Sequence, residues 1–174
     1  TMTVFDQVAE PLLLHRRLSS SEIRNRVVET LDLVGIPRAR ERLSVYPHEL
    51  SGGLRQRVCI AIALVCEPKL LIADEPTSML DVSIRVGILN LMLDLKDRER
   101  LAFLYVTHDL ASARYVADYM LVMYAGQIVE QGPSERVLQS PLHPYTQLLL
   151  DSVPNPALAT RERIDVRKGV ASAA

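Results

Sequence analysis

The sequence has little that would indicate a membrane span or a charged ligand surface. Its longest apolar run, Val58–Cys66, is well short of the ~18 residues that a membrane-spanning helix needs. Lysine and arginine number 20 against 21 acidic residues, and the net charge of −1 gives no basic field that would attract nucleic acid or an anionic membrane. We therefore expect a soluble protein that binds no nucleic acid and that reaches a membrane only through partners.

Cysteine is also scarce, which excludes a disulfide scaffold. Cys59 and Cys66 lie about two turns apart on one predicted helix, too far for a disulfide, and both are expected to be core thiols in a reducing compartment. The chain has no internal repeat and no low-complexity segment. Its 174 residues are enough for one domain with a real core.

The most informative stretch is Leu50–Asp81, LSGGLRQRVCIAIALVCEPKLLIADEPTSMLD. Ser51 can cap the helix that follows, and Gly52 and Gly53 let the backbone approach whatever lies at the N-terminus of that helix. Such a terminus favours an anion, most often phosphate. Taken alone, the turn fits an ordinary capped helix equally well.

A short apolar run, Leu70–Ala73, follows this helix and is expected to be a parallel strand covered on both faces. It ends in Asp74 and Glu75 and is stopped by Pro76. Adjacent carboxylates at the end of a buried strand suit two tasks. One can hold Mg²⁺ through water, and the next can orient or deprotonate an attacking water.

A second apolar run, Leu101–Val106, ends in Thr107-His108-Asp109. This run is also predicted to be a buried strand, and its end should lie beside the end that carries Asp74 and Glu75. An isolated histidine is usually structural or exposed, but an imidazole at this edge of a sheet could contact a γ-phosphate.

Together these residues resemble the ABC-transporter ATPases. LSGGLRQR resembles their signature motif, LLIADEP their Walker B motif, SMLD their D-loop and YVTHD their switch histidine. The four motifs stand in the family's order and spacing, and the resemblance extends from Met2 to about Pro156. One departure is Leu54, where the family most often has glutamine; apolar residues are tolerated there in peptide-type relatives.

The resemblance implies an α/β fold, namely a partial P-loop NTPase (ABC ATPase) fold. It has a mostly parallel sheet with helices on both faces and an α-helical subdomain. The implied divisions are a helical subdomain at 1–50, an ATPase core at 51–140 and a C-terminal extension at 141–174. The P-loop pattern G-x-x-x-x-G-K-[ST] is absent from these residues. We therefore expect the C-terminal portion of a subunit, marginally stable and inactive alone, with an unpaired strand edge beside Leu101–Val106.

The resemblance also assigns roles to the site residues. Two subunits would face head to tail, each ATP lying between one P-loop and the partner's Ser51, Gly52 and Gly53. Asp74 would hold Mg²⁺ through water, Glu75 would act on the attacking water, His108 would contact the γ-phosphate, and Asp81 would link the two sites. Expected partners are a second ABC ATPase subunit, transmembrane permease subunits and, indirectly, an extracytoplasmic solute-binding protein. The expected location is peripheral, on the cytoplasmic face of the cell or inner membrane.

The segment Ser140–Thr146, SPLHPYT, narrows the class. It resembles the HPYT element of ATPases that serve oligopeptide, dipeptide and nickel importers. The stretch CEPKLLIADEPTSMLDV also resembles the sequence around Walker B in the same branch. An ordinary helix start bounded by proline would explain HPYT as well.

The remaining pattern predicts helices and strands along the rest of the chain. Ser19 and Glu22 form a capping-box pattern before a helix that stops at Gly35. In the helix before it, His15 is expected on the same apolar side as Val4, Val8 and Leu12. The other expected elements are a helix at 3–17, a helix around 84–95, a helix ending near 117, strands at 119–124 and 128–130, helices at 134–138 and 145–150, and a loose tail from 153.

Two alternatives remain. The chain could be a truncated, non-catalytic ABC fragment that donates Ser51 to a partner's ATP or competes for the permease. It could instead be an ABC-type ATPase of DNA maintenance, but such proteins need long coiled-coil heptads, which are not visible in these residues, and HPYT disfavours them.

Overall fold

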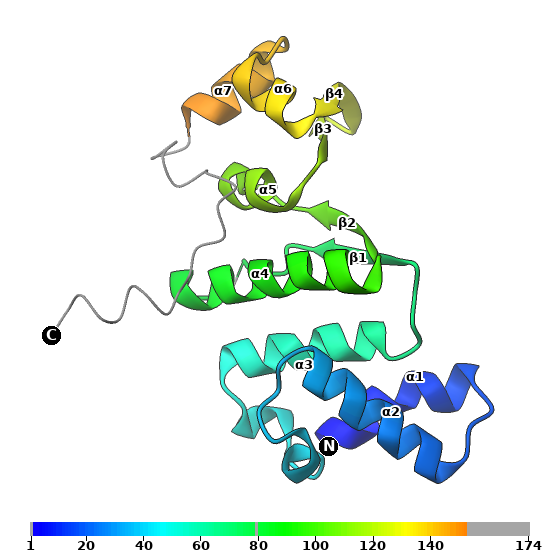
Figure 1. Ribbon diagram of the computed structural model, residues 1–174. Coiled ribbons are helices and arrows are strands. Elements are labelled where there is room, and N and C mark those ends of the chain that lie inside the picture. The colour runs from blue at the N-terminus through cyan, green and yellow to red at the C-terminus, as the bar shows by residue number, and fades with distance from the viewer. Residues whose placement is uncertain (1, 79, 153–174) are drawn as a thin grey trace, which may run out of the picture. The chain divides into compact units, whose positions relative to one another are not determined.

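The computed structural model describes residues 2–78 and 80–152, which belong to two compact units (Figure 1). The first unit comprises residues 1–72 and 76–104, and the second comprises residues 73–75 and 105–174. Both helices and strands are present, so the predicted α/β class is confirmed.

The first unit is mostly helical. Figure 1 shows α1, α2 and α3 packed together, with α4 alongside α3. Side chains at helical spacing are fully buried on the inner faces of these helices and form the core. The elements are α1 (Val4–His15), α2 (Ser20–Leu33), η1 (Ala39–Arg42), η2 (Pro47–Glu49), α3 (Gly52–Leu64) and α4 (Val82–Glu99).

The start of α2 is fixed by the predicted capping box. The Ser19 hydroxyl accepts the Glu22 backbone N–H at 3.4 Å, and the Glu22 carboxylate accepts the Ser19 backbone N–H at 2.7 Å. Bonds from the hydroxyl and backbone of Ser19 hold the pKa of Glu22 below its usual value. Thr3 and Asp6 form the same reciprocal pair before α1. Both boxes satisfy N–H groups that a helix start leaves without partners.

Strands β1 (Leu70–Asp74) and β2 (Ala102–Val106) form a two-stranded sheet. The Ala102 N–H donates to the Lys69 carbonyl, and the Glu75 N–H donates to the Val106 carbonyl, so the strands run parallel. The prediction that both are buried on two faces is wrong for the described residues, because Ile72 is 65% exposed and Val106 is 45% exposed. Alternate side chains point to opposite faces of a strand, and only one face of this sheet is covered.

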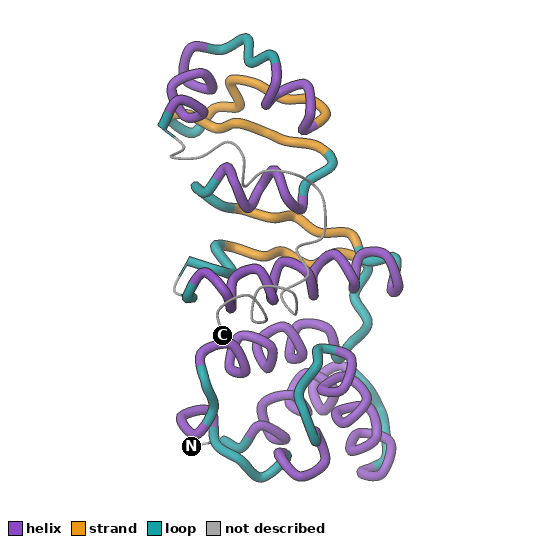
Figure 2. Tube along the Cα trace, turned by 60° about the vertical axis from the view of Figure 1, so that its left-hand side comes forward, coloured by secondary structure: helices purple, strands orange, loops and turns teal. Residues whose placement is uncertain are grey.

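The second unit is built on an antiparallel hairpin, which Figure 2 shows beside two short helices. Its turn is Ala125-Gly126, whose φ angles of 49° and 78° are those of a tight hairpin turn. The returning strand is longer than the predicted 128–130. Met120, Val122 and Val137 form the buried core. The elements are α5 (Leu110–Val116), β3 (Tyr119–Tyr124), β4 (Gln127–Pro133), α6 (Ser134–Gln139) and α7 (Pro144–Asp151).

Two side-chain predictions in the first unit are wrong. His15 is exposed at the end of α1 instead of facing the core. Cys59 is exposed and Cys66 is half-buried, so neither is a core thiol. The reason is that α3 ends at Leu64 and buries only one face, while the chain turns at Glu67 with a φ of 53°.

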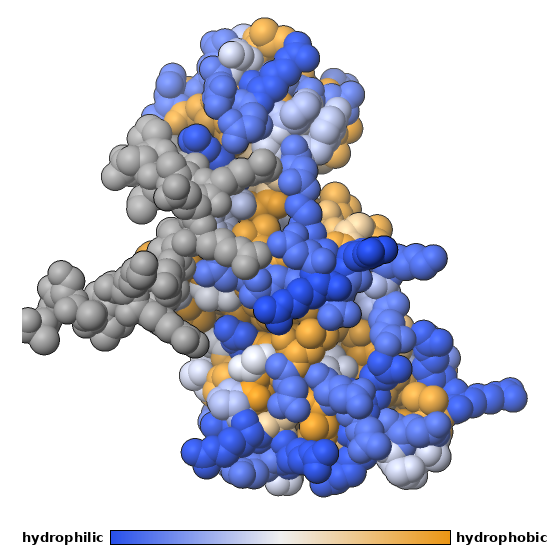
Figure 3. All heavy atoms as spheres, viewed as in Figure 1, coloured by the Kyte–Doolittle hydropathy of each residue, from blue (hydrophilic) through white to orange (hydrophobic). Residues whose placement is uncertain are grey.

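Within residues 2–78 and 80–152, no helix combines the length and apolar character that a membrane crossing requires. Apolar side chains do remain on the surface, as the orange patches among blue residues in Figure 3 show. The tail predicted from Val153 onward lies outside the described residues.

Candidate functional site

Two of the candidate catalytic side chains meet in the second unit. Glu75 directly follows β1, and His108 lies two residues beyond β2. The Nδ1 atom of His108 is 2.7 Å from Oε1 of Glu75, although the residues are 33 positions apart in the chain. An ionised carboxylate only accepts hydrogen bonds, so Nδ1 carries the proton in this contact when Glu75 is ionised.

The backbone of Glu75 is held in an unusual conformation. Its φ is 42°, in the left-handed region, which costs a non-glycine residue about 1–2 kcal/mol. The bond from its N–H to the Val106 carbonyl, 2.9 Å long, ties this strained residue to the end of β2. The side chains of His108 and Glu75 are 76% and 44% exposed, so the pair faces solvent at the carboxyl ends of parallel strands. Sheets of this class bind their ligands at that edge.

Asp74, the residue assigned to Mg²⁺, is the exposed last residue of β1. Within the described part of the chain, no three acidic, histidine or cysteine side chains gather closely enough to hold a metal by themselves. Protein-bound Mg²⁺ usually takes one or two carboxylates and completes its shell with water and substrate phosphates. An exposed Asp74 therefore fits such an ion as one ligand of a metal–nucleotide complex.

The Ser-Gly-Gly turn lies in the first unit, where the structure gives its two glycines different surroundings. Ser51 is exposed and caps α3, since its Oγ accepts the Leu54 N–H at 3.4 Å. A Cβ atom on Gly52 would lie 3.8 Å from Leu80, an ordinary contact, but one on Gly53 would lie 2.8 Å from Cγ2 of Ile84. Gly53 is thus required by the packing of α3 against α4.

Asp81, the predicted D-loop carboxylate, occupies the N-cap position of α4 and is exposed. Its side chain makes no capping bond there. Because α3 and α4 pack against each other within the first unit, the structure places the Ser51 turn and Asp81 at the starts of two contacting helices.

Arg57 of α3 makes a contact outside its own helix. Its guanidinium donates to the Val34 carbonyl at the end of α2 and occupies the space beside Gly35, where a Cβ would be 2.7 Å away. Gly35 itself has a φ of 74°. Burial lowers the pKa of Arg57. Arg57 therefore joins the Ser51 helix to α2, a contact that the local sequence does not indicate.

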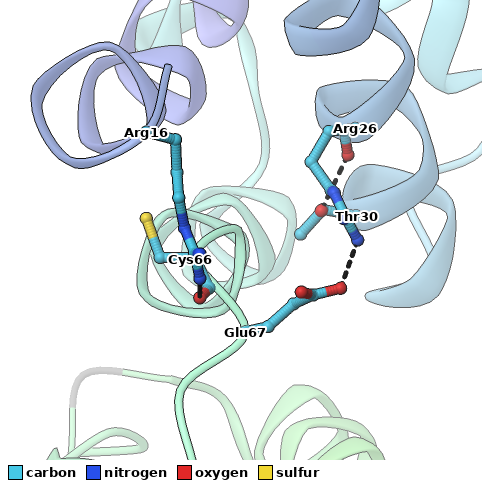
Figure 4. A network of polar contacts seen from close by, with 5 residues as sticks. All are labelled: Arg16, Arg26, Thr30, Cys66 and Glu67. Carbon is cyan, nitrogen blue, oxygen red and sulfur yellow. Dashed lines mark hydrogen bonds and ion pairs between the residues drawn. The ribbon is translucent and has the colours of Figure 1, made fainter. Parts of the chain in front are cut away.

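Two further arginines hold the turn that leads into β1 (Figure 4). Arg26 of α2 forms an ion pair with Glu67, and Arg16, just after α1, donates to the Cys66 carbonyl at 3.0 Å. The Thr30 hydroxyl donates to the Arg26 carbonyl at 2.8 Å. Helices α1 and α2 are thereby fastened to the turn from which the Walker B-like strand starts. These pairs join residues 41 and 50 positions apart, which is why the sequence pattern missed them.

Comparison with family models gives two matches. Residues 1–78 match the model described as ABC transporter, and residues 129–173 match the model described as the C-terminal region of oligopeptide/dipeptide transporters. The second match contains the HPYT element, and the first contains the Ser51 turn and the Asp74–Glu75 strand end.

The chain is similar to two curated relatives that carry peptide-transport names. It is 49% identical over 153 residues to the oligopeptide transport ATP-binding protein AppD of Bacillus subtilis, covering 88% of this chain and 47% of that protein. It is 47% identical over 168 residues to the dipeptide transport ATP-binding protein DppD of Escherichia coli, covering 97% of this chain and 51% of that protein. The chain therefore spans about half the length of the curated relatives it matches.

A solved structure shows the same fold. The dimeric structure of MJ0796, a bacterial ABC transporter cassette, aligns with a TM-score of 0.65 at 30% identity and covers 76% of this chain and 57% of that one. The fold predicted from the motifs is confirmed by this likeness.

Proposed function

The chain belongs to the ABC transporter ATP-binding family and carries the C-terminal region of its oligopeptide/dipeptide branch, and on this basis we propose that it is part of an importer's ATP-hydrolysing subunit. The transported solutes are oligopeptides or dipeptides, or nickel or a related solute of the same branch. The observation that carries the proposal is the hydrogen bond between Glu75 and His108 at the ends of neighbouring strands. The names of AppD and DppD support the peptide class.

Glu75 is the group that acts on the attacking water. A carboxylate directly after a strand, with its backbone tied to the next strand, is held where it can orient a water or accept a proton from it. His108 engages one carboxylate oxygen of Glu75 through Nδ1, which fixes the orientation of that carboxylate at the end of β1. The Nε2 atom of His108 is then the part of the ring that contacts the γ-phosphate.

Asp74 would hold Mg²⁺ through water, and the ion would neutralise charge on the β- and γ-phosphates when bound. For this role the protein needs an exposed carboxylate next to Glu75. Asp74, at the end of β1, is such a carboxylate.

Ser51, Gly52 and Gly53 contact the ATP that is held by a second subunit. Ser51 is exposed at the start of α3, which leaves this helix terminus accessible to a phosphate. The dimeric cassette structure supports pairing with a second subunit. The proposed pair is head to tail, and Asp81 links its two nucleotide sites. Closure on ATP and reopening after hydrolysis would move the transmembrane subunits between inward-facing and outward-facing states.

A complete nucleotide site needs a P-loop, and the pattern G-x-x-x-x-G-K-[ST] does not occur in these 174 residues. The P-loop must therefore come from polypeptide other than these residues, and we expect no hydrolysis by the 174 residues alone. The same observation favours one second candidate, a non-catalytic partner that supplies Ser51 to another subunit's ATP or competes for the permease.

The remaining partners follow from the importer assignment. The subunit would lie at the cytoplasmic face of the membrane, bound to permease subunits, and would work with a solute-binding protein on the other side. The net charge of −1 supports the proposal that it binds no nucleic acid.

Genetic replacement in the source organism tests the function. Deleting the codons for residues 1–174 should abolish uptake of a labelled dipeptide or tripeptide, or of labelled nickel, and the intact gene should restore uptake. Normal uptake of all three probes after deletion would refute the importer assignment. The intact mass of the native protein then decides between the two candidates, because a species near 19.5 kDa would have no P-loop and would favour the non-catalytic partner.

A further inference from the structure

The HPYT element forms the start of α7, and each of its first three residues has a separate structural task there. His143 is the N-cap, and its Nδ1 accepts the Tyr145 N–H at 3.1 Å. Pro144 occupies the first helical position, where its missing N–H leaves nothing unsatisfied. The Tyr145 ring packs on Tyr124 of β3, with ring centroids 4.5 Å apart.

Two backbone N–H groups just before α7 cannot be satisfied by HPYT itself. Those of Leu142 and His143 donate to one side chain, Glu130 of β4, at 2.8 Å to Oε1 and 3.0 Å to Oε2. Both carboxylate oxygens are therefore occupied, and each holds one of two consecutive amides. A carboxylate that accepts two N–H groups at a helix start combines charge-assisted bonds with a favourable position at the positive end of the helix.

The surroundings of Glu130 favour its charged form. Burial by itself would raise the pKa of Glu130, but the Leu142 N–H, the Thr146 hydroxyl, the His143 N–H and the charge of His143 together lower it. The Thr146 side chain is buried, and its hydroxyl has no partner in hydrogen-bonding geometry among the described residues.

We propose that Glu130 is the positioning residue of the oligopeptide/dipeptide-type C-terminal region: its two carboxylate oxygens fasten the HPYT segment to strand β4. The matched region begins at residue 129, so this strand and the helix that it holds belong to one sequence module. The HPYT segment and β4 then move together as one rigid body. A partner that binds near α7 would therefore also displace the hairpin of β3 and β4. The proposal does not depend on ATP hydrolysis.

Glu130→Gln is the direct test, because glutamine keeps the shape and one oxygen but presents an NH₂ group to the second amide. Amide hydrogen exchange, followed by NMR on the native protein, should show at least ~10-fold faster exchange at whichever of Leu142 and His143 faces the new NH₂ group, because that amide loses its acceptor. The matched control is Glu135→Gln, since Glu135 is an exposed glutamate of the neighbouring α6 whose carboxylate accepts from the Gln139 side chain.

The amide of Met120, a buried core residue of β3, serves as the reference for the rest of the second unit. It should exchange at the wild-type rate in Glu130→Gln. Equal exchange at Leu142 and His143 in the two glutamine variants would overturn the proposal.

A second measurement needs no variant and covers the case in which Glu130→Gln does not fold. In the wild-type protein, the amide proton shifts of Leu142 and His143 should change together as the pH falls below the usual glutamate range, because both protons point at the same titrating carboxylate. Shifts of these two amides that stay constant both through the usual glutamate range and below it, or that change with different midpoints, would contradict the assignment.

Discussion

Replacing Gly53 with alanine tests whether this glycine serves packing between helices. A Cβ there would lie 2.8 Å from Cγ2 of Ile84, closer than real contacts allow, and that methyl belongs to a β-branched side chain with little rotamer freedom. Overpacking of this kind costs about 1–3 kcal/mol. Alanine also gains roughly 0.5–1 kcal/mol over glycine in a helix, so the net loss is smaller than the clash itself.

Gly52→Ala is the matched control, because the new Cβ would be 3.8 Å from Leu80, in ordinary contact. The gain in helix propensity from glycine to alanine is similar at both positions. The difference in unfolding free energy between the two variants therefore measures the clash with Ile84. Urea unfolding of the native protein should therefore show Gly53→Ala to be less stable than Gly52→Ala by about 1–3 kcal/mol. Adding Ile84→Ala removes Cγ2 and should recover most of that difference, measured as a coupling energy. Equal stability of the two alanine variants would refute the packing argument.

Three further predictions concern the helices and the Ser51 turn. Leu31 is completely buried, so Leu31→Ala should lower the unfolding free energy by about 2–5 kcal/mol in urea titrations; a loss under about 1 kcal/mol would mean the side chain is not in the core. The double-mutant cycle of Arg26→Ala and Glu67→Ala should give a coupling of about 0.2–1 kcal/mol, since both side chains are partly exposed, and zero coupling would show that their ion pair adds nothing. Ser51→Arg should block ATP-driven dimerisation in light scattering while leaving nucleotide binding by the monomer intact, and normal dimers would disprove the phosphate contact.

Local features of the fold could be predicted because neighbouring residues decide them. The Ser19–Glu22 box lies within one helical turn, and the Ala125-Gly126 turn is set by two positive φ angles. The motif order also indicated the ABC ATPase fold, which the comparisons confirm.

Burial was harder to predict, because it depends on what covers a segment. The run ending in Cys66 reads as one apolar helix, yet α3 stops at Leu64 and Cys59 faces solvent. Likewise, an apolar strand such as Leu70–Asp74 predicts two covered faces, although only one is covered in the described residues.

Contacts between distant residues were not predictable from one sequence. Arg57 lies in a motif that suggests a polar surface, and nothing local indicates that it reaches the Val34 carbonyl. Glu130 similarly belongs to a strand in which nothing in the pattern of polar and apolar residues marks it out. The two amides that it binds lie 12 and 13 residues further along the chain. The nucleotide-site roles remain predictions for every site residue, because a bound nucleotide is what would show them; these residues are Ser51, Gly52, Gly53, Asp74, Glu75, Asp81 and His108.

The measurement that tests the central claim most directly is ATP turnover by the native protein carrying Glu75→Gln, with ATP binding measured in parallel. If Glu75 acts on the attacking water through the position that His108 maintains, hydrolysis should fall by about 100-fold or more while ATP binding persists and the closed dimer accumulates. Glu99→Gln, at the exposed end of α4, is the control and should hydrolyse ATP normally. Hydrolysis at the wild-type rate by Glu75→Gln would contradict the account.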